Sequence, residues 1–432
     1  MAYIVALRPM AVVIFNIFIN SLLAMNKFSK ALLLLLALIA IVACSNEVDE
    51  PVPQPSDKEV AIEVVSLVHD SVEVSITPKD ESTLYYAFLH PDTEAFMGRD
   101  ELEIYVDIRY GDYFEMFLTS GKQCLTFQGL IGHSHYKVVY FEYDKATGNK
   151  VGDVIFSERI TTPDAPELFD IDVTDIKGMS AVLNITPPNN ETTYYYYLYP
   201  VADYEKYQHG SDYELMQYDY SFWQYMAAIY EKPLDEVIAN DLVQGAQRVN
   251  TDALLYLAEW NTQYIAWAYG ITPDGQVTTP ITRRCFTTAS PASSSISFEA
   301  ENIKTEWYEQ TTSEGTIRGY VAQVDIIPSS KNERYFATIT NKDWYDWYAS
   351  ENNTGRCDEQ YIMYQILLNA SKPSSQLDEM CHEGDFTYNC FEEREILLRP
   401  DREYALFVFG MDDNGATTGL SVFPFTTGAM PQ

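Results

Sequence analysis

Histidine and cysteine side chains are the residues of this 432-residue chain that could bind a metal ion. His133 and His135 lie two positions apart, so on a strand both would face the same side and could share one ion. Cys381 and His382 are adjacent in sequence, which is poor geometry for chelation. The histidine pair has no third ligand near it, and no set of four ligands forms around Cys381. We therefore expect a solvated turn at 133–135, no metal site and no cofactor.

No residue of the chain lies in a recognisable catalytic motif. Asp412 and Asp413 are paired acids, but beside a turn they are more typical of a hairpin than of acid–base catalysis. No serine lies in a nucleophile elbow, and the chain has no glycine-rich phosphate loop and no calcium-loop pattern. We expect no catalytic residue and no enzyme activity. A hydrolase whose site is assembled from distant loops is the least favoured alternative.

Two tryptophans are the candidate ligand-binding residues. The segment 343–348 reads Asp-Trp-Tyr-Asp-Trp-Tyr, and the matching segment of an earlier repeat has Asp203 and Lys206 in place of Trp344 and Trp347. Two indoles where a related segment carries charges indicate exposed flat surfaces, which could stack on sugar rings or on a partner protein. The alternative is burial beneath the rest of the segment, because tryptophans are usually well buried.

Three sequence markers recur in the same order three times. The first is a strand ending in proline, followed seven residues later by a tyrosine: Pro78 and Tyr85, Pro187 and Tyr194, Pro328 and Tyr335. The second is a leucine six or seven residues before a tyrosine that opens an alternating strand: Leu130 and Tyr136, Leu257 and Tyr264, Leu398 and Tyr404. The third is a closing pair of threonines: Thr161–Thr162, Thr287–Thr288 and Thr426–Thr427.

Short strands at this density, with glycine-containing hairpin turns between them, predict β-sandwiches. The leucine–tyrosine marker resembles the tyrosine corner of fibronectin type III and immunoglobulin-like domains, in which the phenol bonds back to the chain between two sheets. The resemblance implies an all-β chain of three tandem sandwiches. We place these repeats at residues 58–164, 165–290 and 295–428.

The repeats are longer than a plain sandwich of about 100 residues. The excess lies between the aromatic strand and the leucine marker. In the second repeat this stretch has Leu234, Val237, Ile238 and Leu242 at helical spacing, directly after Pro233. We therefore expect each sandwich to carry a partly helical insert.

The N-terminus predicts export. Residues 31–43 are almost wholly apolar, follow Lys27 and Lys30, and end in Val-Ala before Cys44. A basic start, a short apolar run and small residues at the cut describe a signal peptide at 1–43, and thirteen residues are too few to span a bilayer, which needs about 20. Met25 looks like a cleaner translation start than Met1.

The cysteine after the small residues resembles the lipobox of bacterial lipoproteins, which implies cleavage before Cys44 and acylation of its thiol. Residues 44–57 then form an acidic, proline-rich tether. These acids resemble the export signals of surface lipoproteins of Bacteroidetes, and the whole pattern resembles the multi-repeat lipoproteins of those bacteria. The resemblance implies a lipid-anchored protein of the outer membrane, exposed at the cell surface.

The net charge limits the class of partner, and the cysteine content indicates which disulfide and which thiols to expect. With 28 Lys+Arg against 63 Asp+Glu, the net charge of −35 argues against nucleic-acid binding. Removing Cys44 leaves five cysteines. We expect one disulfide among Cys357, Cys381 and Cys390, and buried thiols at Cys124 and Cys285.

The sequence therefore predicts a membrane-anchored, non-catalytic binding or adhesion module for a glycan or a protein. The alternative is a structural spacer, or an accessory subunit of a surface complex or fimbria.

Overall fold

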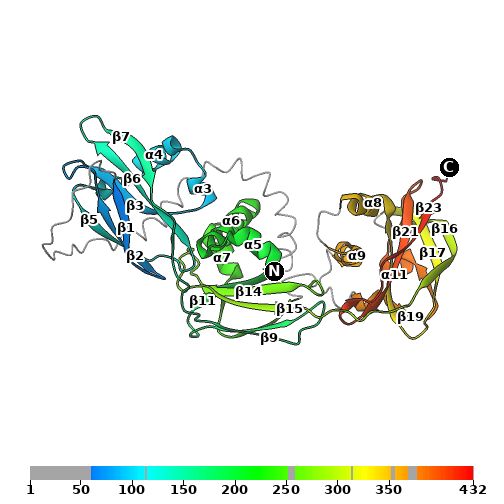
Figure 1. Ribbon diagram of the computed structural model, residues 1–432. Coiled ribbons are helices and arrows are strands. Elements are labelled where there is room, and N and C mark those ends of the chain that lie inside the picture. The colour runs from blue at the N-terminus through cyan, green and yellow to red at the C-terminus, as the bar shows by residue number, and fades with distance from the viewer. Residues whose placement is uncertain are drawn as a thin grey trace.

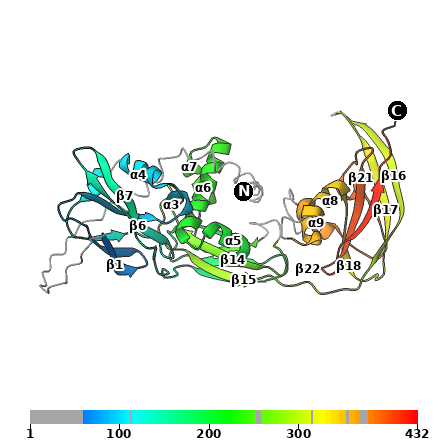
Figure 2. The same ribbon diagram turned by 45° about the horizontal axis from the view of Figure 1, so that its top comes forward.

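The computed structural model describes residues 60–431, except 112–113, 252–257, 313–314, 352–355 and 368–376. The predicted signal peptide, Cys44 and the tether lie outside these residues. Figure 1 shows three β-rich bodies in a row, with the helices α3 to α9 on the inner side of an arc; Figure 2 shows the same arrangement. No described helix is both long and apolar enough to span a membrane.

The first body pairs two antiparallel sheets. One has the order β1-β2-β5 and the other β4-β3-β6-β7, with β8 also on β6. The strands are β1 Ala61–Val68, β2 Ser71–Thr77, β3 Tyr85–Pro91, β4 Leu118–Thr119, β5 Gln123–Gln128, β6 His135–Asp144, β7 Asn149–Phe156 and β8 Ile160–Thr161. Between β3 and β4 lie the helices α3 Glu94–Met97, α4 Glu101–Arg109 and η2 Phe114–Phe117.

The second body repeats this plan with sheets β13-β10-β9 and β12-β11-β14-β15. The strands are β9 Asp170–Thr174, β10 Val182–Thr186, β11 Thr193–Pro200, β12 Val243–Gln244, β13 Gln247–Asn250, β14 Gln263–Gly270 and β15 Thr282–Thr287. Its insert holds α5 Val201–Gln208, α6 Asp212–Tyr230 and α7 Leu234–Asp241. The helix predicted after Pro233 is thus confirmed, with Pro233 as the residue that precedes its first turn.

The third body has sheets β16-β17-β20 and β19-β18-β21-β22, with β23 on β21. The strands are β16 Phe298–Thr312, β17 Gly315–Pro328, β18 Arg334–Asn341, β19 Cys381–Glu383, β20 Phe386–Asn389, β21 Glu403–Asp412, β22 Gly415–Ala416 and β23 Ser421–Thr426. Its helices are α8 Lys342–Glu351, α9 Asp358–Leu367 and α11 Cys390–Arg394.

Alternating side chains from the two sheets of each body pack into one hydrophobic core. In β2 the residues Val72, Val74 and Ile76 are buried while their neighbours face outward. The second sheet of each body is buried on both faces along its central strands, because the helical insert covers the outer face. Tyr195, for example, packs against Trp223 of α6, and Trp267 packs against Tyr204 of α5. The predicted β-sandwich class with helical inserts is confirmed.

The second and third sequence markers are parts of one structure, which we call the corner loop: residues 131–134, 259–262 and 399–402. In each repeat the marker tyrosine hydroxyl accepts a hydrogen bond from the N–H five residues earlier: Ile131 to Tyr136 (3.0 Å), Glu259 to Tyr264 (2.8 Å) and Arg399 to Tyr404 (2.9 Å). The second closing threonine donates to the carbonyl of that same residue: Thr162 (2.7 Å), Thr288 (2.6 Å) and Thr427 (2.7 Å). The expected tyrosine corner is therefore present three times.

Cysteines depart from the expectation. Cys124 and Cys285 lie in β5 and β15 as predicted, but on exposed positions, so the expected buried thiols are wrong. No disulfide links any two of the described cysteines, so the disulfide expected among Cys357, Cys381 and Cys390 is not formed. The buried one is Cys390, whose thiol donates to the carbonyl of Ile396 at 3.3 Å.

His90 is a buried titratable residue in the first insert. Its Nε2 is 2.8 Å from the hydroxyl of Tyr86, and its ring stacks on Phe96 with centroids 4.8 Å apart. Burial, together with the positive charge of Arg99, lowers the pKa of His90 to about 3. The ring is therefore neutral in the folded protein and takes up a proton more readily when the chain unfolds.

This difference predicts acid sensitivity of the first repeat. Because the folded pKa is below the ordinary value of 6.5, stability is lost as pH falls from 6.5 toward 3. Between pH 7 and pH 5, this one group lowers the free energy of unfolding by about 2 kcal/mol. We expect urea unfolding of His90→Phe to lose about 2 kcal/mol less over this interval than the parent protein does. His69→Gln, in the β1–β2 turn, is the control and should behave as the parent; an equal loss in His90→Phe would contradict the prediction.

Candidate functional site

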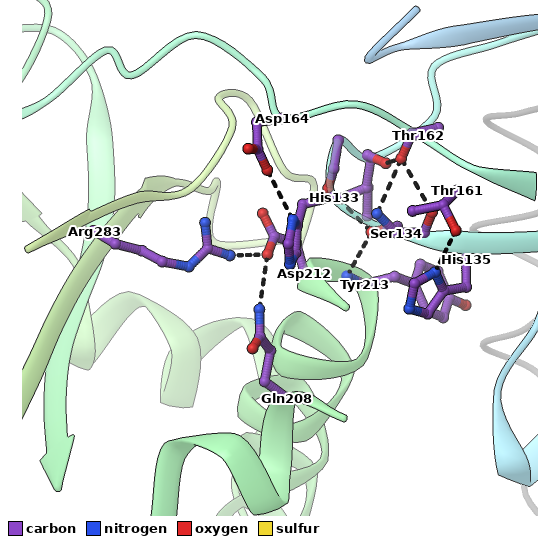
Figure 3. Close-up of polar contacts among 12 residues, drawn as sticks. His133, Ser134, His135, Thr161, Thr162, Asp164, Gln208, Asp212, Tyr213 and Arg283 are labelled. Carbon is purple, nitrogen blue, oxygen red and sulfur yellow. Dashed lines mark hydrogen bonds and ion pairs between the residues drawn. The ribbon is translucent and has the colours of Figure 1, made fainter. Parts of the chain in front are cut away.

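The first corner loop lies between the first and second repeats, where it holds the start of α6 (Figure 3). The N–H of Asp212 donates to the carbonyl of His133 at 2.9 Å, and the N–H of Tyr213 donates to the hydroxyl of Ser134 at 3.0 Å. Ser211, the residue that precedes the helix, makes no side-chain cap. The free N–H groups of a helix start need acceptors. Ser134 therefore caps a helix of the neighbouring repeat.

The two histidines of this loop point to different partners, as Figure 3 shows. His133 adopts a left-handed backbone conformation with φ 51°, and its Nδ1 lies 2.7 Å from a carboxylate oxygen of Asp164. His135 Nδ1 lies 3.0 Å from the hydroxyl of Thr161. Ser134 between them is fully buried. The solvated turn expected at 133–135 is thus wrong: the loop is a contact between repeats. No group of three or more His, Cys, Asp and Glu that could hold a metal occurs among the described residues.

A buried carboxylate lies beside the capped helix start. Asp212 is 4% exposed and forms an ion pair with the guanidinium of Arg283, which extends from β15. The amide of Gln208, at the end of α5, donates to the same carboxylate at 3.3 Å. Arg283 Nε also donates to the hydroxyl of Tyr204 at 2.7 Å. A buried charge is tolerated only when paired and hydrogen-bonded, and the start of a helix favours an anion. The cluster therefore fixes α5, α6 and β15 to one another.

This cluster forms the floor of a polar cavity of about 390 Å³ between the two repeats. Its lining residues come from the corner loop, the linker, α5, α6, β15 and the residue before β15: His133, Asp164, Ala165, Glu167, Tyr204, Gln208, Asp212, Ile281 and Arg283. Carboxylates supply acceptors, while guanidinium and amide groups supply donors. Such a mixture suits the hydroxyl groups of a small polar molecule. From the sequence, only His133 was singled out here, because Tyr204, Asp212 and Arg283 are brought together by the packing of α5, α6 and β15 and not by a short spacing.

The second junction uses the second corner loop in a related way. Glu259 forms an ion pair with Arg356, just before α9, at 2.6 Å. Trp260 packs against the third repeat so closely that a Cβ added at Gly415 would lie 2.5 Å from its ring. The first and second corner loops are each followed by another repeat. Each of these two loops therefore contacts the helical insert of the following repeat, or the turn beside that insert.

The two predicted ligand-binding tryptophans lie on α8 of the third repeat in different environments. Trp344 is half-buried and stacks on Tyr361, with ring centroids 4.8 Å apart and an interplanar angle of 16°. Trp347 is 51% exposed. Tyr348, on the same helix, is fully buried against the core, and its hydroxyl donates to the carbonyl of Arg356 at 2.6 Å. Trp347 is thus the tryptophan of the pair that offers an open face to a ligand.

Comparison with known proteins adds little to this description. No protein-family model matches the sequence, and no curated protein matches it. The crystal structure of the chicken CNTN1 FN1–FN3 domains is matched over 85% of this chain and 97% of that chain, with 11% identity and a TM-score of 0.23. The central fibronectin-III array of RIM-binding protein is matched over 85% of this chain and 96% of that chain, with 9% identity and a TM-score of 0.14. Such TM-scores carry no argument about function.

The cap that Ser134 makes across the first junction can be tested by hydrogen exchange. In Ser134→Ala the N–H of Tyr213 loses its acceptor, and loss of a helix cap costs about 1 kcal/mol. We expect faster exchange, by about fivefold, in peptides covering the start of α6. Ser66→Ala, which alters an exposed strand of the first repeat, should leave that exchange unchanged. Equal exchange in parent and Ser134→Ala would show that the cap does not hold the junction.

Proposed function

We propose that this protein is a non-catalytic binding protein, anchored by a lipid on Cys44 at the surface of the outer membrane, and that it binds a glycan or a protein. The observation that carries the binding role is the polar cavity at the first junction, whose donors and acceptors come from both repeats. Small-molecule sites commonly lie between domains. The exposed Trp347 on α8 is a second contact surface, suited to stacking on a sugar ring.

Glycan is the ligand class that both features favour. The cavity offers exposed carboxylates at Asp164 and Glu167, together with donors from the partly exposed Arg283 and the buried Gln208. Sugar hydroxyls both donate and accept, so they match such a lining better than a purely anionic or apolar molecule would. The net charge of −35 also disfavours anionic ligands.

A glycan array probed with the full chain carrying Cys44→Ala tests this role. We expect specific binding that falls at least about tenfold, or about 1.4 kcal/mol, in Asp164→Ala/Glu167→Ala. The matched control Glu299→Ala/Glu301→Ala removes two exposed acids from β16 and should bind as the parent does. Trp347→Ala, with Tyr230→Ala as its control, tests the second surface. Binding that survives both site variants would discard both sites, and a blank array would discard glycan as the ligand.

The anchor is tested separately. We expect Cys44→Ala to abolish incorporation of labelled palmitate and to release the protein from the membrane fraction, because the acyl chains supply the membrane affinity. Cys124→Ala, which removes another exposed thiol, should remain labelled and membrane-bound. Protease treatment of intact cells then distinguishes outward from inward exposure. Labelled Cys44→Ala protein would contradict the proposed anchor.

A structural spacer is the second candidate, and the pinned junctions favour it. The first junction has two hydrogen bonds at the start of α6, and the second has the Glu259–Arg356 ion pair and the packed Trp260. Repeats joined in this way would hold a distal surface at a fixed distance from the membrane. A blank glycan array together with a stoichiometric protein partner from cell-surface pull-down would favour this role.

A further inference from the structure

Helix α4 in the first repeat has two apolar faces. The residues Ile104, Tyr105 and Ile108 pack into the core of their own sandwich. The opposite face carries three further apolar residues, spaced four apart along the helix and open to solvent: Leu102 (64% exposed), Val106 (42%) and Tyr110 (76%). We call these three residues the α4 stripe. A helix that only covers its own sheet needs one apolar face, so the stripe points to a second contact.

The position of α4 in the fold indicates what kind of contact this is. In the second and third repeats, the corresponding part of the insert meets the corner loop of the preceding repeat. The first repeat has no described repeat before it. Its helix is capped internally instead, by the side chain of Asp100, which accepts from the N–H of Glu103 at 2.8 Å. The first repeat therefore caps this helix by itself, and the α4 stripe on the same helix stays exposed.

Among the described residues, no repeat follows the third corner loop, which is the element that corresponds to the two loops at the junctions. Asp401 has φ 53°, as His133 has 51° in the first loop, so the two loops share one backbone shape. Arg399, Asp401 and Arg402 are all exposed. The N–H of Asp401 donates to the carbonyl of Gly428, so the loop lies beside the C-terminal end, and Figure 1 places that end and α4 at opposite ends of the molecule.

We propose that the third corner loop binds the α4 stripe of a second copy of this chain, so that copies associate head to tail. Charge complementarity supports the pairing. Arg399 and Arg402 are positively charged residues in a chain that has only 28 Lys+Arg against 63 Asp+Glu. The first turn of α4 carries the opposite charge, on Glu101 and Glu103. Arg99, next to the start of α4, is already ion-paired with Asp107 at 3.3 Å.

Within one copy, the first corner loop contacts the insert of the second repeat, and the second corner loop contacts the insert of the third repeat. Between copies, the third corner loop of one copy would contact the insert of the first repeat of the next copy. The two surfaces differ, so the interface is heterologous. Because they lie at opposite ends of the molecule, each copy can bind one neighbour at either end, and the assembly is an open row rather than a closed pair.

The test uses the full chain with Cys44→Ala, so that no lipid drives association. One variant, Leu102→Glu/Val106→Glu, blocks the stripe and keeps the loop. Another, Arg399→Glu/Arg402→Glu, blocks the loop and keeps the stripe. The controls are Val65→Glu, another exposed apolar residue on β1, and Arg248→Glu, an exposed arginine on β13. Circular dichroism and thermal unfolding establish that each variant is folded.

Sedimentation velocity should give a concentration-dependent series of oligomers for the parent and for both controls. Each blocked variant should be monomeric, with its association weakened at least about tenfold. The deciding sample is the equal mixture of the two blocked variants, which has one intact loop and one intact stripe per pair and should stop at dimers. A monomeric parent, oligomers in either blocked variant, or a mixture without dimers would overturn the proposal. None of these results depends on glycan binding.

Discussion

A tyrosine hydroxyl buried between two sheets must find a hydrogen-bond partner, and in each repeat it finds the N–H of the residue five positions earlier. The closing threonine takes up the carbonyl of that same residue. Together these bonds fix a six-residue segment in which the third position is left-handed, as at His133 and Asn261. The corner loop is therefore the same rigid shape in all three repeats, whatever its side chains are.

A rigid loop of fixed shape can act as a docking element while its side chains vary. Ser134 supplies a helix cap at the first junction, Glu259 supplies a charge at the second, and Arg399 and Arg402 carry the opposite charge in the third loop. The fold thus separates two roles. Tyrosine and threonine hold the backbone, and the neighbouring positions decide what the loop contacts.

Regular spacing made the fold predictable. The recurring tyrosines and threonines lie at nearly constant distances because each bonds to the backbone of its own repeat. Tyr85, for example, donates to the carbonyl of Gly121, as Tyr194 does to Gly245. Pro233 and the apolar residues after it revealed α7 for the same local reason. The candidate site was not predictable in this way. Asp212 and Arg283 carry no mark in the sequence, and their role arises from packing between α6 and β15 that no short spacing encodes. His133 and His135 do not share one partner as alternate residues of a strand could, because His133 has a left-handed backbone conformation.

The segment that leaves each repeat is also hydrogen-bonded to the corner loop of that repeat. This arrangement determines which bonds carry the load when the two ends of the protein are pulled apart. At the first junction the N–H of Thr162 donates to Ser134 and the N–H of His133 donates to Pro163, so the strand that leaves the repeat is bonded to the loop that contacts the next one. A stretching force on the two ends of the protein would therefore load these short bonds together with the Ser134 cap before it reached the sheets.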